Sequence, residues 1–182
     1  MKSKSLIIPL VMVALISVGC NKKTENGTTN QNTPPVTDAV TSPSRVTDEG
    51  NLFKAVEGSW IVILENDVNT TKEVVLNTGF KKADKNDPSK MVVTPRVLAL
   101  YKKGENNAKA AAYTLTTPKL TIKDENAKIE GGTVKGDVYV EVNGVILQDA
   151  IIDGNVYFKN EDAKNTFHMD EKSKVTGTME VK

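Results

Sequence analysis

The chain has 182 residues, of which 24 are Lys or Arg and 23 are Asp or Glu, so its formal net charge is +1. This balance excludes the basic excess of nucleic-acid-binding proteins, and no nucleic-acid partner is expected. Cys20 is the only cysteine, which rules out an internal disulfide and leaves the fold dependent on an apolar core.

The N-terminus has the organisation of a secretory signal peptide. Lys2 and Lys4 precede an apolar run over residues 6–18, which is too short to span a bilayer as a helix. The residues that follow, Ser17-Val18-Gly19-Cys20, resemble the lipobox of bacterial lipoproteins, although that pattern usually has Leu where this chain has Ser17.

The lipobox resemblance implies cleavage before Cys20 and acylation of its sulfur. Membrane lipid would then anchor the protein on the extracytoplasmic face of the cell membrane, because acyl chains contribute roughly 0.8 kcal/mol per buried CH₂ group. The alternative is an ordinary signal peptide followed by a stray thiol.

The segment after the cysteine has almost no large apolar side chains and is interrupted by Pro34, Pro35 and Pro43. Such a composition cannot bury enough surface to offset its ordering entropy. We therefore expect three parts: a signal peptide over residues 1–19, a lipidated and disordered linker over 20–46, and a folded domain over 47–182.

A short capping helix is expected at the start of the folded domain. Thr47 or Asp48 can act as its N-cap, and Gly58 is a plausible end. Its apolar side chains lie on one side: Leu52, Phe53 and Val56. This helix would cover the first layer of the β-structure that follows.

The pentapeptide GDVYV at residues 136–140 recurs as GNVYF at 154–158, eighteen residues later. Apolar-x-apolar pairs recur at intervals of 18 to 24 residues: Val74/Leu76, Leu98/Leu100, Leu120/Ile122, Val138/Val140, Val156/Phe158 and Met179/Val181. Glycine-containing turns separate three short alternating segments in each central repeat. The pattern predicts an all-β fold, a single-stranded parallel β-helix (β-solenoid) of about five to six turns.

There are two alternatives to a right-handed β-helix. A β-sandwich also alternates and turns, but it gives no reason for matching residues at a fixed interval. The intervals of 22 to 24 residues favour a right-handed β-helix, whereas the interval of 18 also suits left-handed hexapeptide and bactofilin-type helices.

The stretch from TPKLTIKDENAKIEGG through GDVYVEVNGVILQDAIIDGNVYF resembles the C-terminal part of uncharacterised clostridial-type surface lipoproteins with β-helical domains. The similarity extends back to about Trp60. It implies a fold and a location at the cell surface, and it brings no catalytic motif.

Some β-helical proteins are polysaccharide lyases or hydrolases, so catalytic groups were sought. Arg45 falls in the linker, and Arg96 has no recurring acidic cluster beside it in the repeat. Asp149 and Asp153 flank one segment and could form a carboxylate pair, but such acids are more often turn residues. We expect a non-enzymatic protein, and the alternative is a small carbohydrate-active enzyme.

No metal or cofactor is expected. His168 is the only histidine, and its alternation with its neighbours places it outward. The GGTVKGD segment has Val134 where a calcium-binding nonapeptide needs glycine. The DKND segment at 84–87 could bind calcium, but a solvated loop is the simpler interpretation.

Tyr139 and Tyr157 are the candidate binding face. They are expected to stack on the outer surface, in a column that reads Val75, Ala99, Thr121, Tyr139, Tyr157, Glu180. Aromatic rings can bind sugar rings of a cell-envelope polysaccharide or a partner protein. The alternative is a cross-strand pair that only stabilises the sheet.

The C-terminal segment GTMEVK has no covering helix after it. An uncovered strand edge can pair with another chain and would allow end-to-end self-association. The alternative is that the lysine and glutamate side chains of this edge keep it solvated.

Overall fold

The computed structural model describes residues 43–182. The predicted signal peptide, Cys20 and the other residues up to 42 lie outside the described part of the chain. The linker was expected to extend to residue 46, but β1 (Ser44–Val46) pairs in parallel with β2 (Ile61–Leu64). Arg45 therefore lies in a strand, and the folded domain begins earlier than its composition indicates.

The predicted N-terminal helix is confirmed as α1 (Glu49–Gly58). The side chain of Asp48 accepts a hydrogen bond from the backbone N–H of Asn51 at 3.0 Å, which satisfies one of the unpaired donors of the first turn. Its buried residues are Leu52, Ala55 and Val56. These side chains join the main core, so the helix packs on the first strands of the sheets.

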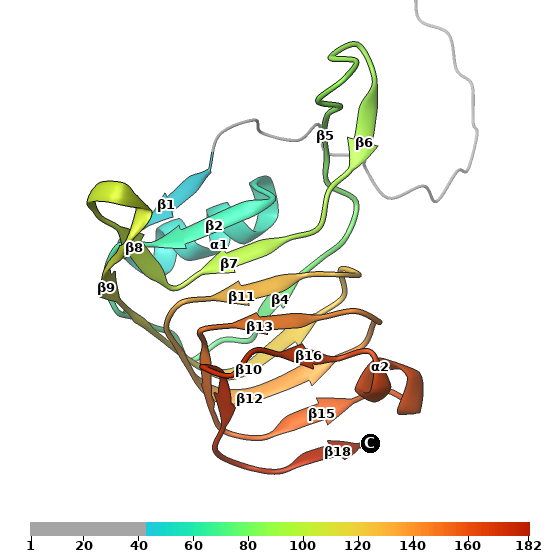
Figure 1. The fold of residues 1–182 in the computed structure, drawn as a ribbon. Coiled ribbons are helices and arrows are strands. Elements are labelled where there is room, and N and C mark those ends of the chain that lie inside the picture. The colour runs from blue at the N-terminus through green and yellow to red at the C-terminus, as the bar shows by residue number, and fades with distance from the viewer. Residues whose placement is uncertain (1–42) are drawn as a thin grey trace, which may run out of the picture. The chain divides into compact units, whose positions relative to one another are not determined.

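A six-stranded parallel sheet follows the chain order. The order is β1, β2, β7 (Val97–Ala99), β11 (Lys128–Glu130), β13 (Ile146–Gln148) and β16 (His168–Met169). Figure 1 shows these strands lying one beside the next from α1 toward the C-terminal end. Each new strand is added to the same edge of the sheet.

An eight-stranded sheet is built around two long strands, β10 (Thr114–Ile122) and β12 (Thr133–Val140), which pair in parallel on both sides of an irregularity after Thr116. The other six strands are short: β3 (Val68–Asn69), β4 (Val74–Leu76), β14 (Ile151–Asp153), β15 (Val156–Phe158), β17 (Lys174–Val175) and β18 (Met179–Val181). All of its pairings are parallel.

The eighteen-residue repeat corresponds to strand register. Leu120 is paired with Val138, and Val138 with Val156, on adjacent parallel strands. The antiparallel pairing of a β-sandwich is therefore absent from these two sheets. The described residues form an all-β protein with parallel sheets, as the sequence predicts.

The apolar pairs point inward and form one core. Leu120, Ile122, Val138, Val140 and Val156 are all at most 1% exposed. The inward side chains of both sheets and of α1 join in this single cluster. Alternation sends the intervening residues to the outer surface.

One predicted column is wrong. Leu98 pairs with Val62 and Ile129 in the six-stranded sheet, whereas Val74 pairs directly with Leu120, 46 residues later. Ala99 is therefore not in the column of Tyr139 and Tyr157.

The long interval contains two antiparallel hairpins. One pairs β5 (Lys81–Ala83) with β6 (Met91–Val93), and the other pairs β8 (Tyr101–Lys103) with β9 (Lys109–Ala112). A short 3₁₀ turn, Glu105–Asn107, joins β8 to β9, and α2 (Glu161–Asn165) follows β15. Among residues 43–182, no helix is long and apolar enough to cross a membrane.

Candidate binding face

Tyr139 and Tyr157 lie side by side on the outer face of the eight-stranded sheet. They are paired in register on β12 and β15, and their ring centroids are 4.9 Å apart with the rings tilted by 50°. The residues before and after each tyrosine are buried, so strand alternation directs both rings outward. Their use as a binding face stays a prediction.

Lysine side chains cover both tyrosine rings. The Lys119 Nζ atom is 4.6 Å from the ring centroid of Tyr139, and the Lys182 Nζ atom is 3.3 Å from that of Tyr157. Only 9% of Tyr157 is exposed. A hydrogen bond with the Tyr157 hydroxyl raises the pKa of Lys182, because it favours the charged ammonium.

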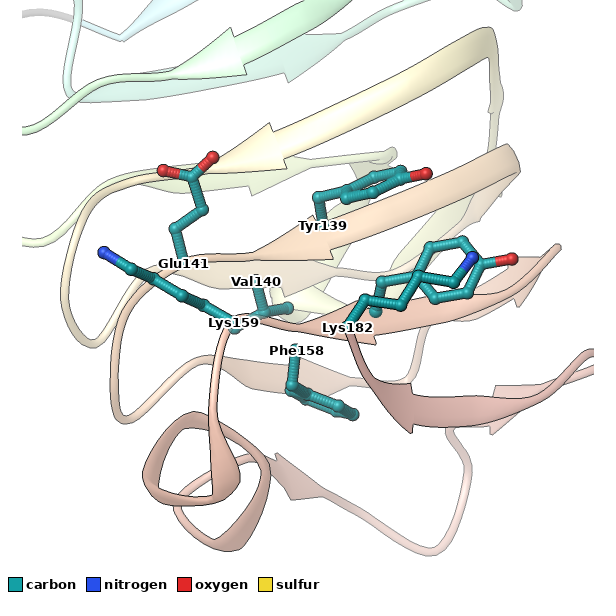
Figure 2. A pocket seen from close by; sticks show the side chains of 7 residues that line it. Tyr139, Val140, Glu141, Phe158, Lys159 and Lys182 are labelled. Carbon is teal, nitrogen blue, oxygen red and sulfur yellow. The ribbon is translucent and has the colours of Figure 1, made fainter.

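A hollow of about 310 Å³ lies beside the two tyrosines. Figure 2 shows Tyr139 on the central strand, Glu141 and Lys159 at the strand ends, and Lys182 lying across the ring next to it. The remaining lining residues are Val140, Tyr157 and Phe158. Phenol hydroxyls and two ammonium groups suit a ligand that carries hydroxyl groups and negative charge.

A larger hollow of about 550 Å³ lies on the outer face of the six-stranded sheet. Its apolar floor includes Ile61, Ile63 and Val97, and its rim includes Lys102 and Lys103 of β8. The repeat pattern does not indicate this groove, because its rim comes from β8, a strand of a hairpin that lies outside the repeat.

The two aspartates considered for catalysis serve local structure. Asp149 has a positive φ of 51° in a turn, and its carboxylate is 2.6 Å from the Lys109 Nζ atom. Asp153 accepts a hydrogen bond from the Thr176 hydroxyl at 3.1 Å. Both carboxylates therefore have structural partners on neighbouring segments.

Arg96 is fully buried between the last turn of α1 and the ring of Phe80. Its Nη1 atom donates to the carbonyl oxygens of Val56 at 3.0 Å and Asn77 at 3.2 Å, and its guanidinium carbon is 4.3 Å from the centroid of the Phe80 ring. Val56 lies in the last turn of α1, where a cation is favoured by the helix dipole. In the sequence, Arg96 is considered only as a catalytic base and set aside because no acidic cluster recurs beside it, and nothing there indicates a link between α1 and the sheets.

The buried charge of Arg96 is only partly compensated by its neighbours. Burial lowers the pKa of Arg96 to about 10, against a smaller opposing effect of Asp124. Burial also raises the pKa of Asp124, whose carboxylate accepts the backbone N–H of Arg96 at 2.8 Å. Within the described residues, the Nε and Nη2 atoms of Arg96 have no hydrogen-bond partner.

The DKND segment forms the turn of the β5–β6 hairpin. Asp84 accepts the N–H of Asn86 at 2.8 Å, and Asp87 accepts the hydroxyl of Ser89 at 2.6 Å. His168 is exposed, as alternation predicts. Over residues 43–182, no group of three or more His, Cys, Asp or Glu side chains is arranged to hold a metal ion.

Comparison of the chain with protein-family models, with curated proteins and with solved structures gave no match. Fold and surface chemistry therefore carry the functional argument.

Proposed function

We propose that the chain is an extracytoplasmic bacterial lipoprotein, anchored through an acylated Cys20, whose β-helical body presents its outer faces for binding or assembly in the cell envelope. It acts without catalysis. The observation that carries the proposal is the register of Leu120, Val138 and Val156 on adjacent parallel strands, combined with a lipobox-like N-terminus.

The β-helix is supported by the order in which the chain visits the two large sheets. From β2 onward, the chain visits the eight-stranded sheet after each strand of the six-stranded sheet and then returns, as in β13, β14, β15 and then β16, β17, β18. Six strands in the first sheet fit the expected five to six turns. The right-handed winding stays a prediction.

Binding is favoured over catalysis because the acidic side chains that were candidates for acid–base chemistry are engaged locally. Asp149 pairs with Lys109, and Asp153 bonds with Thr176. A polysaccharide lyase or hydrolase would need such groups turned toward a substrate. The tyrosine and lysine side chains beside the 310 Å³ hollow are suited to recognition.

The anchor is tested by expressing the full chain in a bacterium with labelled palmitate. The wild-type chain should carry the label and stay bound to the membrane. A Cys20→Ser variant should carry no label and be released. A wild-type chain that is cleaved but unlabelled would contradict the anchor and would favour the ordinary signal peptide.

The binding face is tested on a glycan array with the chain lacking its signal peptide. Tyr139→Ala and Tyr157→Ala should each weaken binding of the same glycans. Tyr101→Ala is the control, because Tyr101 lies on the rim of the other hollow. If the unmodified chain and the three variants bound the glycans equally, the tyrosine pair would only stabilise the sheet.

Assembly through the edge formed by β16, β17 and β18 stays a prediction. Each of these strands has its partner on one side only in the described sheets. Sedimentation velocity of the chain at increasing concentration tests self-association directly.

A further inference from the structure

The β5–β6 hairpin stands apart from both large sheets, since its two strands pair only with each other. Figure 1 shows it extending from the end of the body that carries α1 and β1, away from β18. Its root lies against the body through Lys82, whose Nζ atom is 4.9 Å from the ring centroid of Trp60.

The hairpin has two different faces. Lys81 pairs with Val93, Lys82 with Val92 and Ala83 with Met91. Alternation therefore places Lys81, Ala83, Met91 and Val93 on one face, opposite the face that carries Lys82. Met91 is 46% exposed and Val93 is 67% exposed, the highest values among the large hydrophobic side chains of residues 43–182.

The charge of the body is distributed unevenly. The β5–β6 segment, residues 81–93, holds four lysines and two aspartates, and the β8–β9 segment, residues 101–112, holds three lysines and one glutamate. The rest of residues 43–182 holds 13 basic and 18 acidic residues. Each of the two hairpins is therefore a positive segment on an otherwise negative body.

We propose that the β5–β6 hairpin is a second membrane contact, in which Met91 and Val93 enter the headgroup region of an anionic bilayer while Lys81, Lys85 and Lys90 meet the lipid phosphates. The proposal rests on the membrane anchoring proposed above. Basic residues near an anionic surface bind phosphate headgroups electrostatically, and exposed apolar side chains gain from leaving water. A water-soluble polyanion would satisfy the lysines but leave Met91 and Val93 in water.

The position of the hairpin agrees with such a contact. The segment between Cys20 and Pro43 has 22 residues, and an unstructured chain of that length has a root-mean-square reach of about 25 Å. The chain enters the body through β1, at the end from which the hairpin extends (Figure 1). The anchor would hold this end within reach of the lipid surface.

The test uses the full chain reconstituted in vesicles of phosphatidylcholine, with or without phosphatidylglycerol. Trypsin cleavage after Lys85 and Lys90 should be roughly thirtyfold slower in the anionic vesicles, as expected for two lysines at an anionic surface. Salt at about 1 M should remove the protection, because it screens charges beyond a few ångströms. Quenching of Trp60, the only tryptophan, by brominated lipid gives a second readout.

Matched variants distinguish a lipid contact made by the hairpin from nonspecific binding of the protein to the vesicles. Lys85→Glu/Lys90→Glu and Met91→Ser/Val93→Ser should both lose lipid-dependent quenching of Trp60, and the second variant should also lose tryptic protection. The charge control is Lys172→Glu/Lys174→Glu, and the apolar control is Ile151→Ser, which is 39% exposed elsewhere. Both controls should behave as the unmodified chain.

The two proposals fail separately. The acyl group on Cys20 is read from the intact mass of the chain, and the hairpin contact from cleavage and quenching. Equal cleavage of the unmodified chain in both vesicle types overturns the hairpin contact even if Cys20 is acylated. Loss of protection in a control variant equal to that in a hairpin variant overturns it as well. If the unmodified chain is found by mass to carry no acyl group but is still protected from trypsin in anionic vesicles, the hairpin contact is supported and the anchor is contradicted.

Discussion

Asn155 is hydrogen-bonded to Asp137, eighteen residues earlier in the chain. The Asn155 backbone N–H and Nδ2 donate to the Asp137 carboxylate at 2.9 and 3.1 Å, and Asn155 Oδ1 accepts the N–H of Thr178 at 2.9 Å. Three successive layers of the eight-stranded sheet are thus joined by polar groups at one corner, where the strands turn.

Replacing Asn155 by alanine removes the side-chain part of this connection. We expect Asn155→Ala to lower the free energy of unfolding by about 2 kcal/mol, since each lost hydrogen bond contributes roughly 0.5–1.5 kcal/mol. Denaturant unfolding followed by circular dichroism measures the change. Asn143→Ala, at an exposed position, should be nearly neutral, and equal losses in the two variants would contradict the role of the ladder.

The layers approach closely at Gly154. A Cβ atom there would lie 2.2 Å from the carbonyl oxygen of Gly136 in the preceding layer. Gly154→Ala should therefore cost about 3 kcal/mol or more, because the obstacle is backbone and cannot rotate away. Gly58→Ala is the matched control, as a Cβ at Gly58 meets nothing within 4 Å, and it should cost nothing or stabilise α1 by up to about 1 kcal/mol. Similar melting temperatures for the two variants would contradict the close approach.

Substitutions of the buried Arg96 test whether its charge or its volume contributes more to the stability of the fold. Arg96→Ala should cost about 3 kcal/mol, because it leaves a void and two carbonyl oxygens without their donor. Arg96→Met should cost clearly less, since an apolar side chain of similar length often replaces an uncompensated buried charge with little loss. Urea unfolding of both variants decides the order, and a greater loss in Arg96→Met would show that the charge itself is needed.

Asp124 should make the stability of the protein depend on pH. Its pKa is raised in the folded state above the ordinary value of 3.8, chiefly by burial. The carboxyl group therefore favours folding most at low pH, and this contribution is lost as the pH rises through the folded-state pKa. Asp124→Asn should gain stability relative to the unmodified protein as the pH rises above the ordinary pKa of 3.8. Glu171→Gln, at an exposed position far along the chain, serves as the control, and parallel pH profiles for all three proteins would contradict the effect.

Lys182 controls access to the Tyr157 ring. Lys182→Ala should change stability little, because the cation–π contact is made by an exposed lysine, and should expose the ring to solvent. Chemical nitration mapped by peptide mass measures the exposure. If Tyr157 binds sugar rings, the same variant should bind the array glycans more tightly, whereas unchanged nitration would mean that the lysine does not cover the ring in solution.

The sequence could predict the parts of the fold in which the repeat has constant length. Val138 and Val156 are one position in successive layers because nothing is inserted between them, and the stacking of the two tyrosines follows. The prediction that Leu98 and Leu100 belong to the same column as Leu120 and Ile122 was wrong, because an apolar-x-apolar pair has the same pattern in a strand of either sheet. The two hairpins between Val74 and Leu120 also changed the interval without changing the pattern.

The site was less predictable than the fold. The outward direction of Tyr157 follows from alternation, but its covering by Lys182 does not, because a long flexible side chain can take many directions from the same backbone position. Burial of Arg96 was also hidden, since an arginine after a proline gives no sign of the helix end and aromatic ring that enclose it.

Partners in the eight-stranded sheet are separated by 18 residues between β12 and β15, by 23 between β15 and β18, and by 46 between β4 and β10. Every such contact closes a loop, and the entropic cost of closure rises with loop length. Topologies dominated by distant contacts fold slowly. The layers from β10 to β15, with the shortest loops, are therefore the natural nucleus, and the layer beside α1 should join last and be the first to open.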